Sequence, residues 1–526
     1  MNWLKTWVPK ILTIIVCIAL LLVISQSLLQ LFKYNITMIG FPYNADYGEG
    51  PILDQVMRLS KGKTIYPNDI SQPPYIIGNY PPLYQLVQVP FALIFGPAFW
   101  YGRIINLISI LAAAFFIGAT LYEINKDIVS AVIGGLLLLT TPYIISWAGF
   151  VRVDSFALGL SWAAIYLAVR GIGKPKSLIW SAIFLSAAIY TRQSYGLAAP
   201  FASFIFLLSK RPENFDPKEK YKNIFHKFFS SISWKPAFHL TLWTAGISGT
   251  ILIFLLLITR GGFFFNIVTA NVNPFIWNTV RDYANKIVEH MPILAGGSIL
   301  FFLSAIWFKQ RSWWLAAPYL IGATISAMTV GKDGSNVNYL FELMAAFSFT
   351  IGASLGVIGI SWKSKPWEWV GKGWWAKILL MLLLGLQVVG LREWCQQEHC
   401  QWPIDRTKND YADIERMVEI ATEADGPILA DEFMGSVVMG GKELSFQPFE
   451  YKQLVLGEVW DERDFILSIF DQEYAYIFLY DTPWWDSQNA RWTRNQLEAI
   501  YGNYITIERL ADTQIMIPRE PFDFNN

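Results

Sequence analysis

The sequence predicts a mostly α-helical, polytopic membrane protein that ends in a small soluble α/β domain. Of its 526 residues, 54% are hydrophobic and only 16% are charged, a composition that disfavours an ordinary soluble enzyme. The net charge is zero, which gives no sign of a nucleic-acid partner. Residues 1–391 nevertheless carry 30 basic and 15 acidic side chains, whereas residues 392–526 carry 11 and 26. We therefore expect a basic membrane domain over 1–391 and an acidic soluble domain over 392–526.

The membrane domain contains eleven apolar stretches that we expect to cross the bilayer. A hydrocarbon core about 30 Å thick requires roughly 20 apolar residues per helix. The fifth and sixth stretches are short, so they represent either two spans or one long helix broken at 191–194. The predicted spans are 11–31, 100–121, 128–147, 155–169, 178–190, 195–208, 238–259, 291–308, 313–329, 339–360 and 378–391.

The apolar run 83–95 decides the topology. It contains Pro90 and follows Pro81 and Pro82, so we expect an interfacial or re-entrant segment rather than a span. With the N-terminus inside, 19 of the 30 basic residues then fall on the cytoplasmic side, as the positive-inside rule requires. The sequence thus predicts a multi-pass plasma-membrane protein with a cytoplasmic N-terminus, a large first outer loop over 33–99 and an extracytoplasmic C-terminal domain.

The soluble domain shows helical spacing over 411–424 and strand-like runs at 427–430, 475–480, 504–507 and 514–517. Trp484, Trp485 and Trp492 could stack on sugar rings, although such a cluster more often packs a core or contacts a membrane. Cys395 and Cys400 are five residues apart and could form a disulfide in an oxidising compartment or remain two free thiols. The role of this domain stays open.

Polar residues gather at the predicted outer ends of the helices. Charged groups near a bilayer are costly, so such clusters are candidate functional sites. A carboxylate there could take a proton from a hydroxyl while cations stabilise a departing phosphate. The cluster comprises Asp46, Tyr47 and Glu49 in the first outer loop, Arg152 and Asp154 before the fourth span, Arg192 and Gln193 in the next outer turn, and Lys332, Asn336, Asn338 and Glu342 around the start of the tenth span.

These residues suggest definite roles. Asp46 or Glu49 would be the base, while Arg192 and Lys332 would bind phosphate, the arginine by its planar fork and the lysine as a point charge. Asn338 and Glu342 are four residues apart, so one helical face could present both to a sugar. The alternative is purely structural: Arg152 with Asp154, or Asp46 with a nearby lysine, would form interfacial ion pairs.

Two other chemistries find no support in the sequence. Residues 331–335 contain Gly-Lys but lack the spacing of a phosphate-binding P-loop. The four histidines, at 226, 239, 290 and 399, show no metal-ligand spacing, so we assign no metal-binding residues.

Several short motifs appear in a fixed order along the membrane domain. They are Ala45-Asp46-Tyr47-Gly48-Glu49-Gly50, Gly62-Lys63-Thr64-Ile65-Tyr66, Tyr80-Pro81-Pro82-Leu83-Tyr84, Arg103, Arg152-Val153-Asp154, Thr191-Arg192-Gln193-Ser194, and the segment from Gly331-Lys332 through Asn338-Tyr339 to Glu342. In this order the chain resembles the GT-C superfamily of polytopic glycosyltransferases, particularly the branch of protein O-mannosyltransferases and the lipid A aminoarabinose transferase.

The resemblance implies inverting transfer of a hexose or pentose from a polyprenyl-phosphate carrier to an acceptor hydroxyl on a glycan, lipid or protein. It places catalysis at Asp46, with Glu49 as the alternative and Asp154 as a further acidic position. Protein mannosyltransferases have adjacent Asp-Glu, whereas Tyr47 and Gly48 intervene here. Some relatives use a divalent cation, Mg²⁺ or Mn²⁺, and others do not. The expected donor-phosphate residues are Arg152, Arg192 and Lys332, and the expected substrate-binding residues are Tyr47, Gln193, Tyr84, Asn336, Asn338 and Glu342.

The rival hypothesis is a transporter or flippase of a glycolipid or sugar. It would also explain many spans in contact with membrane lipids. Transporters usually contain internal repeats and helices broken at the membrane midplane. The sequence shows no repeat, and its polar residues gather at one predicted face, which favours the transferase.

Overall fold

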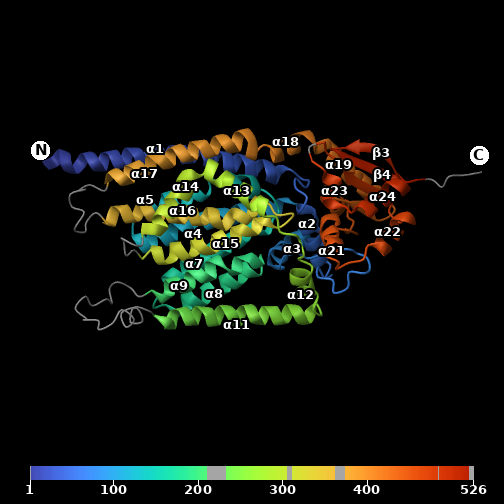
Figure 1. The fold of residues 1–526 in the computed structure, drawn as a ribbon, viewed down its shortest axis with the longest axis horizontal. Coiled ribbons are helices and arrows are strands. Elements are labelled where there is room, and N and C mark those ends of the chain that lie inside the picture. Colours follow the sequence, from blue (N-terminus) through green and yellow to red (C-terminus); the bar gives the residue numbers. More distant parts are fainter. Residues whose placement is uncertain (1, 210–232, 305–310, 362–373, 484, 520–526) are drawn as a thin grey trace, which may run out of the picture.

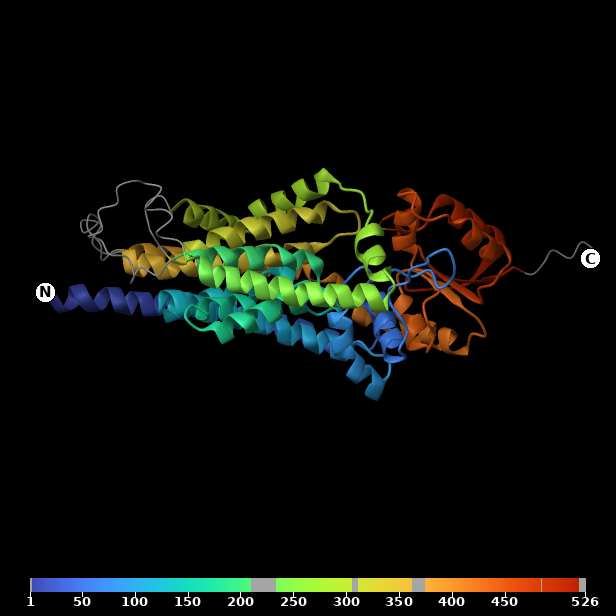
Figure 2. The ribbon, with the colours of Figure 1, turned by 90° about the horizontal axis from the view of Figure 1, so that it is seen from below.

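The computed structural model describes residues 2–209, 233–304, 311–361, 374–483 and 485–519. A long bundle of helices occupies one part of the molecule, with the N-terminus at its far end (Figure 1). The chain after the last bundle helix forms a compact unit at the opposite end, called the C-terminal domain below. The view from below shows the same division (Figure 2).

The bundle helices coincide with the predicted spans. In the described part of the chain, seven helices are long and apolar enough to cross a membrane. In a bilayer every backbone polar group needs an internal partner, which a helix supplies. These seven are α1 (Asn2–Gly40), α4 (Trp100–Asn125), α7 (Val153–Arg170), α11 (Trp234–Ile258), α15 (Trp313–Met328), α16 (Phe341–Ser361) and α17 (Trp374–Trp394).

The other four predicted spans are shorter helices, so length and composition support seven crossings in the described residues, or eight if the bent pair 277–303 counts as one. They are α5 (Ile128–Leu138), α8 (Pro175–Ile189), α9 (Ala198–Leu208) and α14 (Pro292–Leu303). The last follows α13 (Trp277–His290) at a bend of 96°. Residues 305–308, at the end of the predicted span 291–308, lie outside the described residues.

Two breaks refine the sequence prediction. A single helix over 128–147 is wrong: α5 stops at Leu138, and Pro142 opens the separate helix α6 (Pro142–Trp147). Thr141, directly before the proline, is extended, because a following proline disfavours helical backbone. At 191–194, α8 and α9 are two helices separated by a 3₁₀ turn, Gln193–Gly196. Arg192, directly before this turn, has extended backbone, which interrupts the helix and resolves the ambiguity in favour of two helices.

The loop after α1 carries two helices, α2 (Glu49–Ser60) and α3 (Leu83–Phe95). Helix α1 itself runs to Gly40, beyond the predicted end of the first span. Helix α3 has only 13 residues and exposes Leu93 and Ile94, as expected for a segment that does not cross the bilayer. These elements lie at the end of the bundle that faces the C-terminal domain (Figure 1).

The C-terminal domain is built around a four-stranded sheet of order β1-β2-β4-β3. Its strands are β1 (Ile428–Ala430), β2 (Tyr476–Tyr480), β3 (Tyr504–Leu510) and β4 (Thr513–Pro518), which confirms all four predicted strands. Strands β1 and β2 are parallel, and the other two pairings are antiparallel. The helices are α18 (Trp402–Asn409), α19 (Tyr411–Glu423), α20 (Met434–Met439), α21 (Pro448–Leu456), α22 (Arg463–Phe470), α23 (Ser487–Arg491) and α24 (Arg494–Asn503).

The loop after α1 and the C-terminal domain are packed together. Tyr75 forms an isolated bridge with Phe446, and the backbone N–H of Ile77 donates to Gln447 Oε1 at 2.8 Å. Arg58 of α2 donates to the backbone carbonyl of Leu444 at 2.8 Å. The buried core is continuous from the bundle helices into α19 and α20. The relative position of bundle and domain is therefore fixed by packing rather than by a flexible linker.

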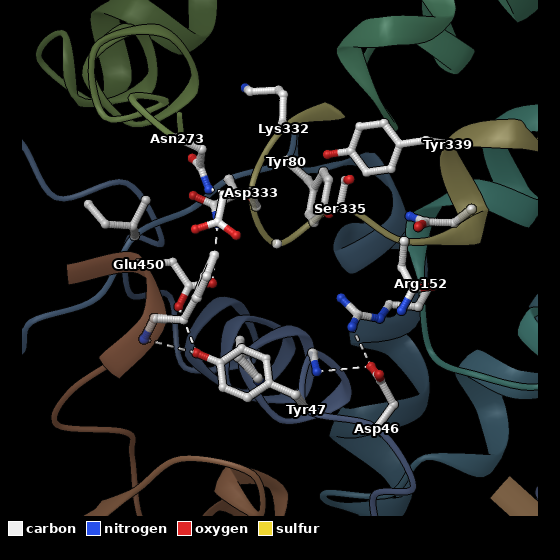
Figure 3. Close-up of a pocket in the computed structure, with 18 of the residues that line it drawn as sticks. Asp46, Tyr47, Tyr80, Arg152, Asn273, Lys332, Asp333, Ser335, Tyr339 and Glu450 are labelled. Carbon is white, nitrogen blue, oxygen red and sulfur yellow. Dashed lines mark hydrogen bonds and ion pairs between the residues drawn. The ribbon is translucent and has the colours of Figure 1, made fainter. Parts of the chain in front are cut away.

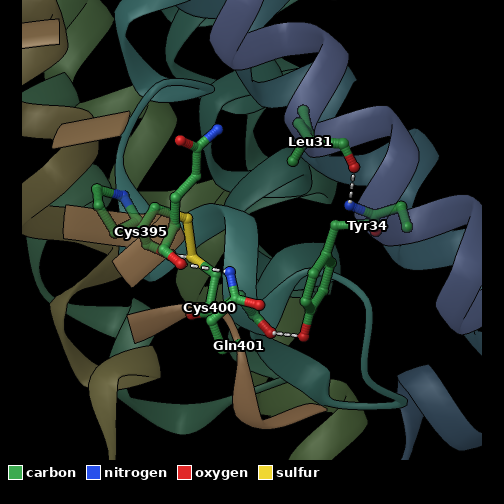
Figure 4. The surroundings of a disulfide bond; sticks show 9 residues. Leu31, Tyr34, Cys395, Cys400 and Gln401 are labelled. Atoms are coloured by element: carbon green, nitrogen blue, oxygen red, sulfur yellow. Dashed lines mark hydrogen bonds between the residues drawn. A yellow bond between two sulfur atoms is a disulfide. The ribbon is translucent and has the colours of Figure 1, made fainter. Parts of the chain in front are cut away.

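A disulfide joins Cys395 and Cys400 where the chain leaves α17 (Figure 4). Both cysteines are buried, and Cys400 Sγ lies 3.8 Å from the carbonyl oxygen of Pro142 in α6. The predicted pairing is thus present, and the two-free-thiol alternative is not what the structure shows. The bond closes the connection between α17 and α18.

Candidate active site

A cavity of about 670 Å³ lies between the bundle and the C-terminal domain. Its wall is formed by the loop after α1, the segments before α7 and α9, the loop between α15 and α16, and parts of α21 and α23 (Figure 3). Residues predicted from distant parts of the sequence meet here. Eight of the twelve predicted site residues line the cavity: Asp46, Tyr47, Arg152, Arg192, Gln193, Lys332, Asn336 and Asn338.

Asp46 presents its carboxylate at the edge of this cavity. It forms an ion pair with Arg152 and accepts a hydrogen bond from the backbone N–H of Gly48 at 3.0 Å (Figure 3). A Cβ at position 48 would lie 1.8 Å from Arg152 Nη1, so a larger residue there would displace the guanidinium from this position. Burial raises the pKa of Asp46 above its ordinary value, although Arg152 favours the charged form.

Glu49 lies three residues further on but outside the cavity, with no exposed surface. The guanidinium of Arg103 in α4 donates two hydrogen bonds to it, from Nε to Oε1 at 3.0 Å and from Nη2 to Oε2 at 2.8 Å. The backbone N–H groups of Ala45 and Val151 donate to the same carboxylate, at 2.8 and 2.7 Å. Glu49 therefore ties the loop after α1 to α4 and to the segment before α7.

Asp154 and Arg192 form a second buried ion pair. Asp154 does not line the cavity, but it accepts a hydrogen bond from Asn338 Nδ2 at 3.0 Å. Arg192 does line it, with its guanidinium 4.2 Å from the centre of the Tyr339 ring. The pairing of Arg152 with Asp154, considered as a structural alternative, is replaced by the pairs Asp46–Arg152 and Asp154–Arg192.

Lys332 is the third basic residue predicted to bind the donor phosphate, and it also lines the cavity. Its ammonium donates to Asn271 Oδ1, and the next residue of its loop, Asp333, accepts a hydrogen bond from Gln453 of α21 at 3.0 Å. Burial, and then Arg192, lower the pKa of Lys332. Asn336 lines the cavity and accepts a hydrogen bond from the backbone N–H of Val337.

The remaining predicted residues occupy other positions. Gln193 lines the cavity and donates to the carbonyl of Asn79 at 3.3 Å. Tyr84 is fully buried outside it, with its hydroxyl on the carbonyl of Gly102 at 3.1 Å. Glu342 is buried in a small adjoining pocket that it shares with Arg192 and Asn338. The structure thus places Tyr84 and Glu342 behind the wall rather than on its surface.

The C-terminal domain supplies a whole side of the cavity that the sequence did not reveal. Its lining residues include Glu432, Phe449, Glu450, Lys452, Trp485 and Arg491. Of these, only Trp485 carried a signal, as part of the tryptophan cluster. Trp484 lies outside the described residues, and Trp492 is a core residue that donates to Asp431 at 3.0 Å.

Glu432 holds this side of the cavity together. Its carboxylate forms ion pairs with Arg406 of α18 and Arg491 of α23. Burial opposes its ionisation, but Arg491 and Arg406 outweigh burial and lower the pKa of Glu432 to about 2. The backbone carbonyl of Glu432 also accepts a hydrogen bond from Asn44 at 3.1 Å, which links it to the residue two before Asp46.

The described residues contain no group of three or more His, Cys, Asp or Glu side chains suited to a metal ion. Asp46 and Glu432 instead face arginines, which compete for the same oxygen atoms.

Comparison with known proteins supports the fold. Residues 79–234 match the family model described as dolichyl-phosphate-mannose-protein mannosyltransferase. No curated protein matches the sequence. The structure resembles that of ArnT from Cupriavidus metallidurans bound to undecaprenyl phosphate, with a TM-score of 0.62 and 12% identity over 94% of this chain and 97% of that chain. The structure of the same protein in the apo state gives a TM-score of 0.59 and 11% identity, again over 94% of this chain and 97% of that chain.

The chain therefore has the fold of the polytopic GT-C glycosyltransferases, as the motifs indicate. The family-model match includes the segments that carry Arg103, Arg152, Asp154 and Arg192. Asp46 and Lys332 lie outside it. Their place beside the matched residues is shown by the structure alone.

Proposed function

We propose that this protein is a membrane glycosyltransferase that moves a sugar from a polyprenyl-phosphate donor to an acceptor hydroxyl on the extracytoplasmic side. The observation that carries this proposal is the meeting of the Asp46 carboxylate with Arg152, Arg192 and Lys332 in a single cavity at the end of an apolar bundle. The description of the matched family names dolichyl-phosphate-mannose. The structurally similar protein ArnT is bound to undecaprenyl phosphate. Both are consistent with a lipid-phosphate donor.

The donor phosphate is assigned to Arg192 and Lys332, with Arg152 as a third cation. The Arg192 guanidinium is held by Asp154 and by the Tyr339 ring, so it is oriented before the substrate arrives. Such preorganised charge stabilises the developing phosphate without reorganisation in the transition state. Asp154 is a positioning residue in this scheme, because it holds both Arg192 and Asn338.

Asp46 is assigned as the base. The acceptor oxygen attacks the anomeric carbon while its proton passes to the Asp46 carboxylate. The bond between the anomeric carbon and the phosphate oxygen breaks, and its electron pair leaves on the phosphate. Attack from the face opposite the phosphate inverts the configuration at the anomeric carbon.

The ion pair between Asp46 and Arg152 engages one of the two carboxylate oxygen atoms, Oδ2. Arg152 and the backbone N–H of Gly48 both contact Oδ2, and the positive charge of Arg152 lowers the basicity of the whole carboxylate. A donor phosphate offers the guanidinium a competing anionic partner with matching geometry. Donor binding would thus release Asp46, which favours an order in which the donor binds before the acceptor.

Glu49 has a different role in this proposal. Its carboxylate is occupied by Arg103 and by two backbone N–H groups, and it lies away from the cavity. It fixes the loop that carries Asp46. Tyr47 and Gln193 remain substrate-binding candidates on the cavity wall, as do Asn336 and Asn338.

The proposal is tested by incubating the purified full chain with a panel of polyprenyl-phosphate hexoses and pentoses. The acceptors are extracted envelope lipids, glycans and Ser/Thr peptides, and mass spectrometry records a sugar-sized mass increase. Parallel reactions contain EDTA, Mg²⁺ or Mn²⁺, which settles the cation requirement that the family resemblance leaves open. Movement of a glycolipid across sealed vesicles without any glycosidic product would favour the transporter instead.

A further inference from the structure

We propose that the C-terminal domain provides the acceptor subsite of the cavity and that the acceptor group it binds is a saccharide. The role as an acceptor subsite rests on the function proposed above, whereas saccharide binding can be measured whether or not the protein transfers a sugar. The residues concerned are Trp485, Arg491, Glu450 and Lys452 of the C-terminal domain, together with Tyr47. We call this set the acceptor wall.

Arg491 contacts both aromatic rings of the acceptor wall. The guanidinium of Arg491 lies 5.3 Å from the centre of the Trp485 ring and 4.6 Å from that of the Tyr47 ring. Glu432 pairs with Arg491 and keeps it in this place. Trp485 nevertheless remains 46% exposed while it lines the cavity. Arg491 covers one face of this indole, and the exposed remainder of the ring is available to stack on the apolar C–H face of a sugar ring.

The polar part of the acceptor wall suits sugar hydroxyls. The Tyr47 hydroxyl donates to Glu450 Oε2 at 2.9 Å (Figure 3), and Asn79 Nδ2 lies 3.4 Å from Glu450 Oε1. The Lys452 ammonium donates to the carbonyl of Asn489. Carboxylate, phenol and ammonium groups at one surface offer both acceptors and donors, which an array of hydroxyls requires. An indole face beside such groups is the combination that a saccharide needs.

The cavity is therefore divided by chemistry. The bundle contributes Arg192 and Lys332, which suit the donor phosphate, whereas the C-terminal domain contributes all of the acceptor wall except Tyr47. Asp46 belongs to the loop packed between the two parts, through Asn44 and Glu432. Two substrates bound on opposite sides would meet at this carboxylate, as the transfer requires.

The first test measures saccharide binding with no donor present. The full chain is placed in nanodiscs, because detergents with sugar head groups would compete. Saturation-transfer difference NMR then monitors methyl glycosides of hexoses and N-acetylhexosamines. We expect binding by the wild type and a roughly tenfold loss of affinity in Trp485→Ala. Phe470→Ala is the matched control, since Phe470 is 55% exposed on α22 and does not line the cavity.

The outcomes are decisive in both directions. Absence of saccharide binding to the wild type, or equal binding by Trp485→Ala, overturns the proposal. Binding of a Ser/Thr peptide in place of every saccharide also overturns it. The acceptor could be a free saccharide or a glycolipid, so the same saccharide is tested both free and attached to a lipid anchor. Equal affinity indicates recognition of the sugar alone. Tighter binding of the lipid form indicates a glycolipid acceptor. Either of these last results supports the acceptor wall.

A kinetic test separates this proposal from the function itself. In a working transfer assay, Trp485→Ala should raise the KM for the acceptor and leave the KM for the donor unchanged. Saccharide binding without any transfer by the wild type would refute the glycosyltransferase and leave the subsite standing. Transfer that is insensitive to Trp485→Ala in acceptor KM would refute the subsite and leave the glycosyltransferase standing.

Discussion

Asp46 and Glu49 lie three residues apart and are both acidic, yet the fold gives them different surroundings. Asp46 lines the cavity and shares its charge with one arginine, Arg152. Glu49 has no exposed surface and has four hydrogen bonds from Arg103 and the backbone. Only the first is placed to meet a substrate. The second is placed to hold the loop.

Glu49→Gln should lower stability strongly. The substitution leaves the fully buried Arg103 without its charge partner, a loss that typically costs about 3–5 kcal/mol. Thermal unfolding of the variant in nanodiscs measures the effect. Glu498→Gln is the control, because its pair with Arg494 is exposed and such pairs contribute about 0–1 kcal/mol. Equal unfolding temperatures for the two variants would contradict the structural role of Glu49.

The pH dependence of transfer should report on Asp46. The carboxylate must be ionised to accept a proton, so kcat/KM falls as the pH drops through its pKa. Since burial raises the pKa of Asp46, this acidic limb should lie above the ordinary aspartate value of about 3.9. A pH profile of kcat/KM from pH 4 to 8 measures it. A rate that stays flat down to pH 4 would contradict a desolvated aspartate as the base.

At the scale of elements, the connection between α17 and α18 is closed by the Cys395–Cys400 bond. Denatured protein should therefore react with one equivalent of a maleimide, at Cys17, before reduction and with three equivalents after it. Mass spectrometry counts the adducts. Three adducts without reductant would show that the bond is absent from the native protein and would weaken the case for an oxidising compartment.

The helices and strands were largely predictable because each depends on local patterns. The strands at β1 to β4 follow short apolar runs, and the bundle helices follow long ones. The break between α5 and α6 was missed, although Pro142 marks it, because hydropathy is continuous across it. Short helices such as α9 are also difficult to count as spans from length alone.

The site was only half predictable, because half of it comes from the far end of the chain. Tyr47 and Glu450 are hydrogen-bonded although 403 positions separate them. No local pattern marks Glu432, Glu450 or Arg491, since their function depends on the packing of the C-terminal domain against the loop after α1. The cations Arg152, Arg192 and Lys332 were found, because charge at the ends of apolar helices is conspicuous in a sequence.

At the scale of the whole molecule, the C-terminal domain and the N-terminus lie at opposite ends of the bundle (Figure 1), and the cavity lies where the bundle meets that domain. The positive-inside pattern predicts that the N-terminal end is cytoplasmic. In a Cys17→Ala background, Glu473→Cys in the C-terminal domain should react with a membrane-impermeant maleimide on intact cells. Lys174→Cys, before α8, should react only after permeabilisation. The reverse labelling pattern would place the cavity in the cytoplasm and contradict the proposed side of transfer.

The most direct test of the proposed chemistry is a comparison of Asp46→Asn with the wild type. Both proteins are given a polyprenyl-phosphate sugar that the wild type uses, and the release of polyprenyl phosphate and the glycosylated acceptor are quantified together. The variant should fold, bind the donor and form product at a rate reduced by at least about 10²–10⁴, the usual contribution of a general base. Product formation by Asp46→Asn at the wild-type rate would contradict the assignment of Asp46 as the base.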